Sequence, residues 1–379
     1  MLIKLKSLDI LIKFKPTNHI MTLYDLNKLN IFYVTGSKSF ELSGAKDYVT
    51  NNISNGRKIN QFNDFSANPK FDDVKKGVTL FKEGNYNCIV AIGGGSVIDM
   101  GKLIAFYAEN GIDDFYTTVG EPFSVACPIV AIPTTAGTGA EVTNNAVILI
   151  PSYGLKVSLR DPRMIPNIAI VDPSLMQGAP KHVVLCAGID AVTQVIEPYL
   201  TVKANPMTDA LCRAAIPVGL RVLRDIVEKG CPDGWDSMAW VSTCGGLALA
   251  NAGLGAVHGF AGVIGGKTNA PHGEICGALL PAVIAVHLRH AKKDTCMYER
   301  INWVAEQIDI YFGHSQKGRG LDELQKWTSQ MGLRRLSDLG VNEKDFPIIA
   351  RAAANSSSMR GNPFLLLQPE LEQILYMAS

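Results

Sequence analysis

The chain has 379 residues, of which 47% are hydrophobic and 19% are charged, and its net charge is +1 at pH 7. This length is typical of one very large domain or two ordinary ones, and the composition supplies a sizeable core. The nearly balanced charge excludes the strongly basic class of proteins, so we expect neither nucleic acid nor an anionic membrane as a partner.

The N-terminal segment 1–19 alternates lysine with apolar residues, which predicts one or two β-strands and lacks the uninterrupted apolar core of a signal peptide. No run of 18 apolar residues occurs, so we expect no transmembrane helix. The eight cysteines are scattered and form no CxxC pair. Scattered thiols in apolar runs are typical of a reduced, cytoplasmic protein.

The first half of the chain alternates apolar runs with amphipathic segments. The runs predict strands and the amphipathic segments predict helices. We expect strands at 30–35, 59–65, 88–92, 125–132 and 168–171, and helices at 41–54, 69–84 and 97–109. Because continuous apolar strands alternate with helices, we predict an N-terminal α/β domain with a Rossmann-like parallel sheet covered on both faces.

The second half, after a segment rich in proline and turns between 151 and 180, is predicted to be helical. The expected helices lie at 182–200, 206–228, 235–254, 279–291, 296–312, 320–331 and 369–378. We place the domain boundary near residue 175. The chain then divides into an α/β domain, 1–175, and an all-α helical-bundle domain, 176–379.

A glycine-rich turn, Gly93–Ser96, follows the strand at 88–92. Glycines after a strand let the backbone approach a pyrophosphate, and the next helix offers free N–H groups at its N-terminus. The turn is neither GxGxxG nor a Walker A loop, because Ile98 and Leu103 stand at required positions. A tight turn without a ligand is the alternative. The hydroxyl-rich strand end 131–143 favours nucleotide binding.

Two histidines, His258 and His272, lie in a glycine-rich apolar stretch, 248–282, with little charge. Asp190 lies in an equally apolar predicted helix, where an unpaired carboxylate is costly. One carboxylate and two imidazoles suit Zn²⁺ or Fe²⁺. The alternatives are histidines bonded to backbone carbonyls and an aspartate that pairs with a base or caps its helix. Gln194, one turn after Asp190, is a weak neutral ligand at best.

The chain resembles the iron-containing (group III) alcohol dehydrogenases, which share a fold with glycerol dehydrogenase and dehydroquinate synthase. The resemblance covers nearly the whole chain. It rests on the order and spacing of GGGSVIDMGK at 93–102, PTTAGTGAEVT at 133–143, PNIAIVDPSL at 166–175, GIDAVTQVIEPY at 188–199, LGAVHGFAG at 254–262 and APHGEICGALLP at 270–281.

The resemblance implies a dinucleotide site and a metal site. The dinucleotide site is implied at Gly93, Gly94, Gly95, Ser96, Asp99, Thr134, Thr135 and Thr138. The family's metal ligands are Asp, His, His and His, and they fall on Asp190, Gln194, His258 and His272. A further family histidine falls on Gly262. Two imidazoles are thus replaced, which leaves a three-ligand site for Zn²⁺ or Fe²⁺.

The turn after the first strand of the α/β domain, Gly36-Ser37-Lys38, bears on the choice of cofactor. In the family that this chain resembles, members that prefer NAD look to carry an aspartate at this position. That aspartate holds the ribose hydroxyls. A carboxylate repels a 2′-phosphate, whereas Gly36, Ser37 and Lys38 can accept it through N–H, hydroxyl and ammonium groups. We therefore favour NADP over NAD. An exposed turn whose lysine has no ligand is the alternative.

The resemblance implies hydride transfer between a nicotinamide and an alcohol or its carbonyl, with Asp190, His258 and His272 as catalytic metal ligands. The missing imidazole at Gly262 leaves room for a larger or more polar substrate, such as a polyol or sugar. Two alternatives remain: a lyase similar to dehydroquinate synthase, for which Lys156, Arg160 and Arg163 offer basic groups, and a metal-less nucleotide-binding descendant. Apolar helices indicate a homodimer or a higher homo-oligomer.

Overall fold

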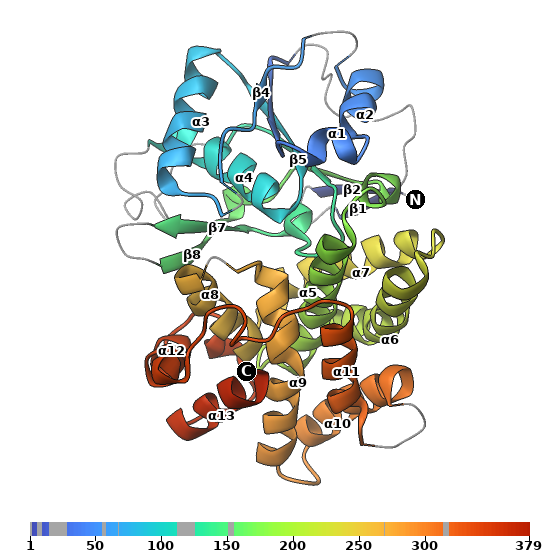
Figure 1. The fold of residues 1–379 in the computed structure, drawn as a ribbon. Helices are drawn as coiled ribbons and strands as arrows, with labels where there is room; N and C mark the ends of the chain where they lie inside the picture. The colour runs from blue at the N-terminus through green and yellow to red at the C-terminus, as the bar shows by residue number, and fades with distance from the viewer. Residues whose placement is uncertain are drawn as a thin grey trace. The chain divides into compact units, whose positions relative to one another are not determined.

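The chain forms two compact units, Met1–Thr135 with Gly139–Ala179, and Ala136–Thr138 with Pro180–Ser379. Figure 1 shows an α/β unit in blue to green and a helical unit in green to red. The structure, a computed structural model, describes residues 2–5, 10–14, 29–54, 58–66, 68–111, 126–150, 155–268, 270–313 and 318–379.

The first unit is built on one sheet, in the order β1-β2-β9-β6-β5-β3-β4. Neighbouring strands from β2 to β4 are parallel, and β1 pairs antiparallel at the edge. The predicted parallel sheet is thus confirmed. The strands are β1 Leu2–Leu5, β2 Ile10–Phe14, β3 Ile31–Thr35, β4 Gln61–Phe62, β5 Cys88–Gly93, β6 Ile129–Pro133 and β9 Ile168–Val171.

Helices cover both faces of this sheet because successive side chains of a strand point to opposite faces. In β5, Ile89 and Ala91 belong to a core cluster with α3 and α4, whereas Val90 and Ile92 belong to a second cluster with α1 and α2. The helices are α1 Ser39–Leu42, α2 Ala45–Asn52, α3 Phe71–Glu83 and α4 Gly95–Asn110.

The sequence prediction misses one element of this unit. Strands β7 Asn145–Ile150 and β8 Leu155–Arg160 pair antiparallel, although part of this region was expected to be turns. Two other expectations need correction. The strand expected at 59–65 shrinks to β4, and the helix expected at 41–54 divides into α1 and α2. Gly44, with φ 76°, starts α2 in a left-handed conformation that glycine adopts without strain.

In the part of the second unit that the structure describes, the regular elements are helices, as predicted. Its helices are α5 Lys181–Leu200, α6 Pro206–Lys229, α7 Gly234–Ala252, α8 Ala256–Thr268, α9 His272–His290, α10 Cys296–Phe312, α11 Gly320–Gln330, α12 Phe346–Ala354 and α13 Gln368–Ala378. Two helices, α8 and α12, were not predicted, and α9 begins seven residues before the expected start at 279. Glycines and short apolar runs weaken the helical pattern in α8.

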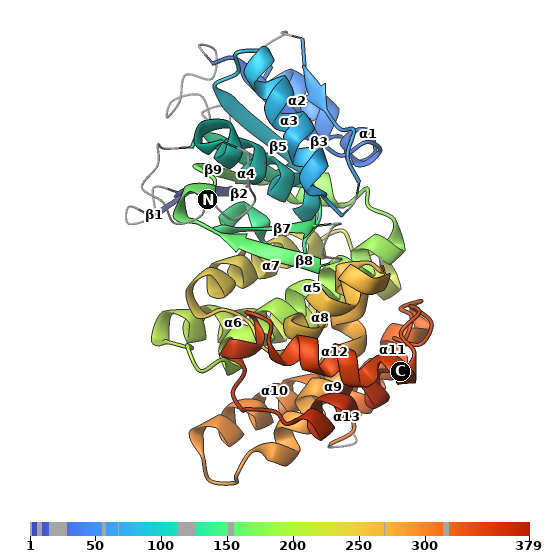
Figure 2. The same cartoon turned by 90° about the vertical axis from the view of Figure 1, so that its left-hand side faces the viewer.

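Helix α5 lies at the centre of the helical unit, packed against α6, α7, α9 and α10 (Figure 2). By length and composition α5 could cross a membrane, but 83% of its apolar window is buried inside the protein, as in the core helix of a soluble domain. A polar side chain on a helix so enclosed is desolvated, and it needs a partner inside the protein.

Candidate metal centre

One face of α5 carries polar side chains that lie in the interior. Asp190, Gln194 and Glu197 follow one another at spacings of four and three, so they share a face of the helix. All three side chains are buried. Asp190 and Gln194 were predicted from the sequence as candidate ligands, but Glu197 was not, although its spacing of seven residues from Asp190 places it on the same helix face.

The structure brings Asp190, His258 and His272 together from α5, α8 and α9. His258 Nε2 lies 3.5 Å from Asp190 Oδ1, and His272 Nε2 lies 3.8 Å from the same oxygen. The two imidazole rings are tilted, with centroids 5.2 Å apart. Asp190 Oδ1 is buried and has no hydrogen-bond partner among the described residues. A buried, unbonded carboxylate oxygen facing two imidazole nitrogens is the arrangement that a divalent cation completes.

The electrostatics of this group favour a positive charge at its centre. Burial raises the pKa of the Asp190 carboxyl, but His272 and His258 outweigh burial and bring its pKa below the ordinary value. Burial lowers the pKa of His258, but Cys276, Asp190 and Glu197 outweigh it and raise that pKa well above the ordinary value. A divalent cation would supply this charge and displace the imidazole proton.

Glu197 fixes the orientation of His258. Its Oε2 lies 2.6 Å from His258 Nδ1, and its two oxygens accept the backbone N–H groups of Val257 at 2.7 Å and of His258 at 3.3 Å. The carboxylate therefore caps the N-terminus of α8 and holds the ring through Nδ1. With Nδ1 bonded to a carboxylate, Nε2 is the ring nitrogen that faces Asp190 and can bind a metal.

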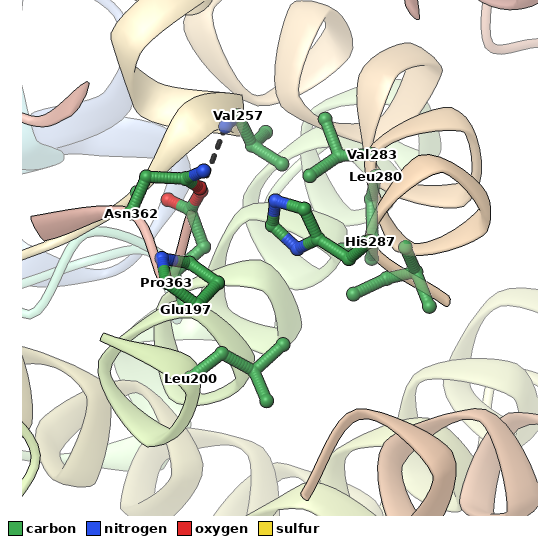
Figure 3. A pocket seen from close by; sticks show the side chains of 10 residues that line it. Glu197, Leu200, Val257, Leu280, Val283, His287, Asn362 and Pro363 are labelled. Carbon is green, nitrogen blue, oxygen red and sulfur yellow. Dashed lines mark hydrogen bonds between the residues drawn. The ribbon is translucent and has the colours of Figure 1, made fainter. Parts of the chain in front are cut away.

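A small cavity of about 10 Å³ lies beside Glu197, and Leu200, Val283 and His287 also line it (Figure 3). The His287 ring points into this space, and neither of its nitrogens has a hydrogen-bond partner among the described residues. The cavity has the size of about one water molecule. Burial lowers the pKa of His287 to about 4, so this imidazole is neutral at pH 7.

Cys276 belongs to the same group as Asp190, His258 and His272, but it was not predicted from the sequence. It follows His272 by one turn of α9, and its Sγ lies 3.7 Å from His272 Nε2 and 4.0 Å from His258 Nε2. One ligand atom each from Asp190, His258, His272 and Cys276 all lie within 4.8 Å of one another. The His-x₃-Cys spacing was visible in the sequence, but no helix was predicted before residue 279, so the two side chains were not placed on one face.

The two positions where the family's imidazoles are replaced differ from each other in their surroundings. Gln194 Nε2 donates a hydrogen bond of 2.6 Å to the carbonyl of Thr138, so its amide nitrogen is engaged with backbone. A side chain at Gly262, by contrast, would meet open space, because no atom of the described residues lies within 4 Å of an added Cβ.

Helix α9 is held tightly where it presents His272. An added Cβ at Gly273 would lie 2.0 Å from the backbone oxygen of Cys186 on α5, so only glycine permits this approach. Glu274 is fully buried and accepts hydrogen bonds from the Arg334 guanidinium at 2.9 and 3.0 Å. The close approach fixes the first turn of α9 against α5, and the ion pair joins the same turn to Arg334 in the segment after α11.

In the α/β unit, the predicted nucleotide residues lie at the carboxyl ends of neighbouring parallel strands. Gly36 follows β3, Gly93 ends β5 opposite Pro133 of β6, and Thr134 N donates to Gly93 O. Gly94 is the N-cap residue of α4, and a Cβ added at Gly94 would lie 3.4 Å from the hydroxyl oxygen of Thr135. Carboxyl ends of parallel strands are where open α/β sheets bind nucleotides.

The glycine turn retains features that fit a pyrophosphate. No side chain of the described residues caps α4, and its first turn carries no acidic residue. Thr134 Oγ1 is buried and without a hydrogen-bond partner among the described residues. Uncapped N–H groups and an unbonded hydroxyl are the donors that a phosphate group accepts from.

Two of the predicted nucleotide residues have other surroundings. Asp99 is buried, and its Oδ2 accepts the backbone N–H of Val147 on β7, with Lys102 Nζ 3.9 Å from Oδ1. Burial raises the pKa of Asp99 to about 6. Thr138 belongs to the compact unit of the helices, where its carbonyl accepts from Gln194. Ser37 and Lys38 are exposed in the turn that follows β3.

Known proteins match both halves of the chain. Residues 14–173 match a family described as iron-containing alcohol dehydrogenase, and residues 184–379 match the C-terminal domain of the Fe-containing alcohol dehydrogenase family. A 1,3-propanediol dehydrogenase of Citrobacter freundii is 32% identical over 340 residues, which are 88% of this chain and 87% of the relative.

Solved structures agree with this match. A crystal structure of 1,3-propanediol oxidoreductase superposes with a TM-score of 0.83 at 29% identity and covers 97% of both chains. A sulfoacetaldehyde reductase of Bifidobacterium kashiwanohense, solved in complex with NAD⁺, superposes with a TM-score of 0.82 at 26% identity, over 97% of this chain and 96% of that one. The chain is therefore an oxidoreductase and belongs to the iron-containing alcohol dehydrogenase family.

Proposed function

We propose that this enzyme transfers a hydride between a nicotinamide dinucleotide and an alcohol or its aldehyde or ketone, with a divalent cation held by Asp190, His258 and His272. The observation that carries the proposal is the convergence of these donors from three helices around a buried carboxylate oxygen that has no other partner among the described residues. A cation bound there polarises a carbonyl or lowers the pKa of an alcohol.

The protein groups around the cation have separate roles in this proposal. Asp190 supplies the anionic ligand, and the Nε2 atoms of His258 and His272 supply neutral ones. Glu197 is a positioning residue, because it acts on the site through His258 Nδ1. Gln194 is left out of the ligand set, since an amide is a weak ligand and its nitrogen already bonds the carbonyl of Thr138.

The nucleotide is proposed to bind with its pyrophosphate on Gly93–Ser96. The uncapped start of α4 and the unbonded hydroxyl of Thr134 support this placement. Asp99 is proposed to shape this site from behind rather than to touch the nucleotide, since its Oδ2 bonds the β7 backbone.

The preferred nucleotide is proposed to be NADP. Ser37 and Lys38 are exposed after β3, and the nearest acidic residue in the chain, Glu41, pairs with Lys46 at 2.9 Å. A turn without a free carboxylate does not repel a 2′-phosphate, and the Lys38 ammonium attracts it. NADPH should therefore be used with a higher kcat/KM than NADH.

The substrate is proposed to be a polar aldehyde or ketone, such as a hydroxyaldehyde or a keto sugar, with a polyol as product. The open space at Gly262, where family members carry an imidazole, supports a substrate larger than a simple alkanol. Two of the relatives, a 1,3-propanediol dehydrogenase and a sulfoacetaldehyde reductase, are named for polar substrates of two or three carbons.

A lyase similar to dehydroquinate synthase is the weaker alternative. It would need free basic groups for a phosphorylated substrate. Arg163, however, forms a bidentate pair with Asp161 at 2.7 and 2.8 Å, and Lys156 Nζ donates to Asn68 at 2.8 Å. A metal-less descendant is also disfavoured, because without a cation the buried Asp190 Oδ1 has no hydrogen-bond partner among the described residues and faces His258 and His272 only at 3.5 and 3.8 Å.

The decisive experiment measures net oxidation of NADPH and NADH by purified protein, stripped of metal and reloaded with Zn²⁺ or Fe²⁺. Substrates are simple aldehydes, hydroxyaldehydes and keto sugars. With the polar carbonyl substrates, we expect the absorbance of the reduced nucleotide to fall only when metal is present. One nucleotide should be oxidised for each carbonyl that is reduced. A lyase would convert its substrate without net oxidation of NADPH or NADH. For a metal-less protein, removing and reloading the metal would not change the measured rates.

Two further properties are proposed. The eight cysteines are free, and six of them are buried, which supports a cytoplasmic location with reduced thiols. The apolar helices support a homo-oligomer, which light scattering on the purified protein would detect as a mass of twice 41.0 kDa or more.

A further inference from the structure

The candidate metal centre contains a sulfur atom where the family's set of ligands is made of oxygen and nitrogen. The family's second histidine is replaced by Gln194, whose amide nitrogen bonds the Thr138 carbonyl. The group therefore lacks one strong donor from α5. Cys276 on α9 is fully buried in the same group, with its Sγ 3.7 and 4.0 Å from the Nε2 atoms of His272 and His258.

We propose that the Cys276 thiolate is the fourth ligand of the cation and replaces the imidazole that is missing at Gln194. The proposal rests on the metal-dependent function given above. The geometry supports it, because one donor atom each from Asp190, His258, His272 and Cys276 lies within 4.8 Å of the others. Four donors within one such distance can surround a single ion with bonds of about 2.0–2.3 Å.

The thiol must lose its proton when it binds. The S–H bond breaks, an S–metal bond forms, and the proton leaves to solvent, with no change in oxidation state of sulfur or metal. Metal binding and thiol ionisation are therefore one coupled event.

A thiolate also changes which metal the site prefers. Soft sulfur ligands select Zn²⁺, whereas oxygen and nitrogen ligands alone discriminate less between Zn²⁺ and Fe²⁺. We therefore expect this member of an iron-named family to retain Zn²⁺. Four protein ligands leave no tetrahedral position open, so substrate oxygen must enter as a fifth ligand, which zinc sites accommodate.

The test uses X-ray absorption and optical spectra of the whole protein, loaded with one equivalent of Zn²⁺ or Co²⁺. We expect one sulfur atom at about 2.3 Å in the zinc spectrum, and a thiolate-to-cobalt charge-transfer band in the near ultraviolet. Cys276→Ser should remove both signals and weaken Zn²⁺ binding on the order of 100-fold. The matched control is Cys244→Ser, a buried cysteine of α7, which should keep both signals.

Two results would overturn the proposal. One is a loaded wild-type protein whose zinc shell holds only oxygen and nitrogen, a measurement that needs no variant to fold. The other is a sulfur signal that survives in Cys276→Ser and disappears in Cys186→Ser, which would place the ion at the neighbouring group of His182, Cys186 and Glu274. If turnover is also independent of metal, the proposed function fails; if metal restores turnover without a sulfur ligand, only the thiolate is wrong.

Discussion

The nucleotide turn and the metal centre are built by different means. The turn at Gly93–Ser96 is made of backbone at the ends of adjacent strands, and its residues are consecutive in the chain. The metal centre is made of side chains from α5, α8 and α9. Its members are far apart in the sequence, from Asp190 to Cys276, although their donor atoms lie close together. A site made of backbone tolerates side-chain changes, whereas a site made of side chains can be lost by one substitution.

Asp190→Ala should have the largest effect, because it removes the anionic ligand of the metal centre. We expect bound metal to fall below a tenth of an equivalent and kcat/KM to fall on the order of 10³-fold or more. Atomic emission on dialysed protein and NADPH oxidation measure the two. Asp225→Ala, an exposed carboxylate on α6, is the control and should behave as wild type. Full metal content in Asp190→Ala would show that the side-chain cluster is not the site.

His287 makes the helical unit sensitive to acid. Its pKa is about 4 in the folded protein, below its ordinary value of 6.5, so between those two pH values the unfolded chain binds more protons than the folded one. Its contribution to stability is therefore present above about pH 6.5 and is lost as the pH falls toward 4, by about 3 kcal/mol in total. Urea unfolding at several pH values measures this loss. His287→Leu should flatten the dependence in that window, and an unchanged slope would assign it to other groups.

Glu197→Gln tests the carboxylate that orients His258. The amide retains the size of the side chain but no longer offers an anionic oxygen to His258 Nδ1. We expect metal affinity to fall roughly 10- to 100-fold. Isothermal titration with Zn²⁺ gives the affinity, and a thermal scan of the metal-free protein reports on folding. Glu228→Gln, a carboxylate on α6 bonded to Arg224 and Trp327, is the control. Equal affinities in the two variants would remove Glu197 from the site.

Gly273→Ala tests the close approach that places His272. Its new Cβ would lie 2.0 Å from a backbone oxygen of α5, so the helices must separate, at a cost of about 1–3 kcal/mol. Gly262→Ala is the matched change in open space on α8, and it should gain up to about 1 kcal/mol from better helix propensity. The free energies of unfolding in urea compare the two. If both variants gain stability, the result would contradict the close approach of α9 to α5 at Gly273.

Lys38→Ala should have the smallest effect, because the proposed nucleotide site consists mainly of backbone. We expect KM for NADPH to rise about 5-fold with KM for NADH unchanged, since one exposed ammonium contributes about 1 kcal/mol to a phosphate contact. Initial rates with both nucleotides measure this. Lys46→Ala, also exposed but paired with Glu41, should leave both values unchanged. Equal losses with NADH and NADPH would contradict a 2′-phosphate contact at Lys38.

The same contrast explains how much could be predicted from the sequence. Strands β3, β5 and β9 are continuous apolar runs bounded by turn residues, so their positions were predicted within one residue. The glycine turn was recognised because it is local. Helix α8 was not predicted, because its glycines obscure the helical period, and the hairpin β7–β8 lies partly in a segment whose prolines indicated turns.

The metal centre could be predicted only in part. Asp190, His258 and His272 are unusual in apolar surroundings, and the family motifs place them. Cys276 and Glu197 are ordinary residues in a helix, and they gain importance only when α9 starts at His272 and when α8 packs its N-terminus on α5. These contacts depend on tertiary packing at Gly273 and at Val257, which no local pattern indicates.

The central claim is that one cation binds between α5, α8 and α9. Anomalous diffraction at the zinc edge, from crystals of protein loaded with one equivalent of Zn²⁺, tests it most directly. We expect a single peak about 2.0–2.3 Å from Asp190 Oδ1 and from the Nε2 atoms of His258 and His272. A peak at another group of side chains, or no peak in a protein that still oxidises NADPH, would contradict it.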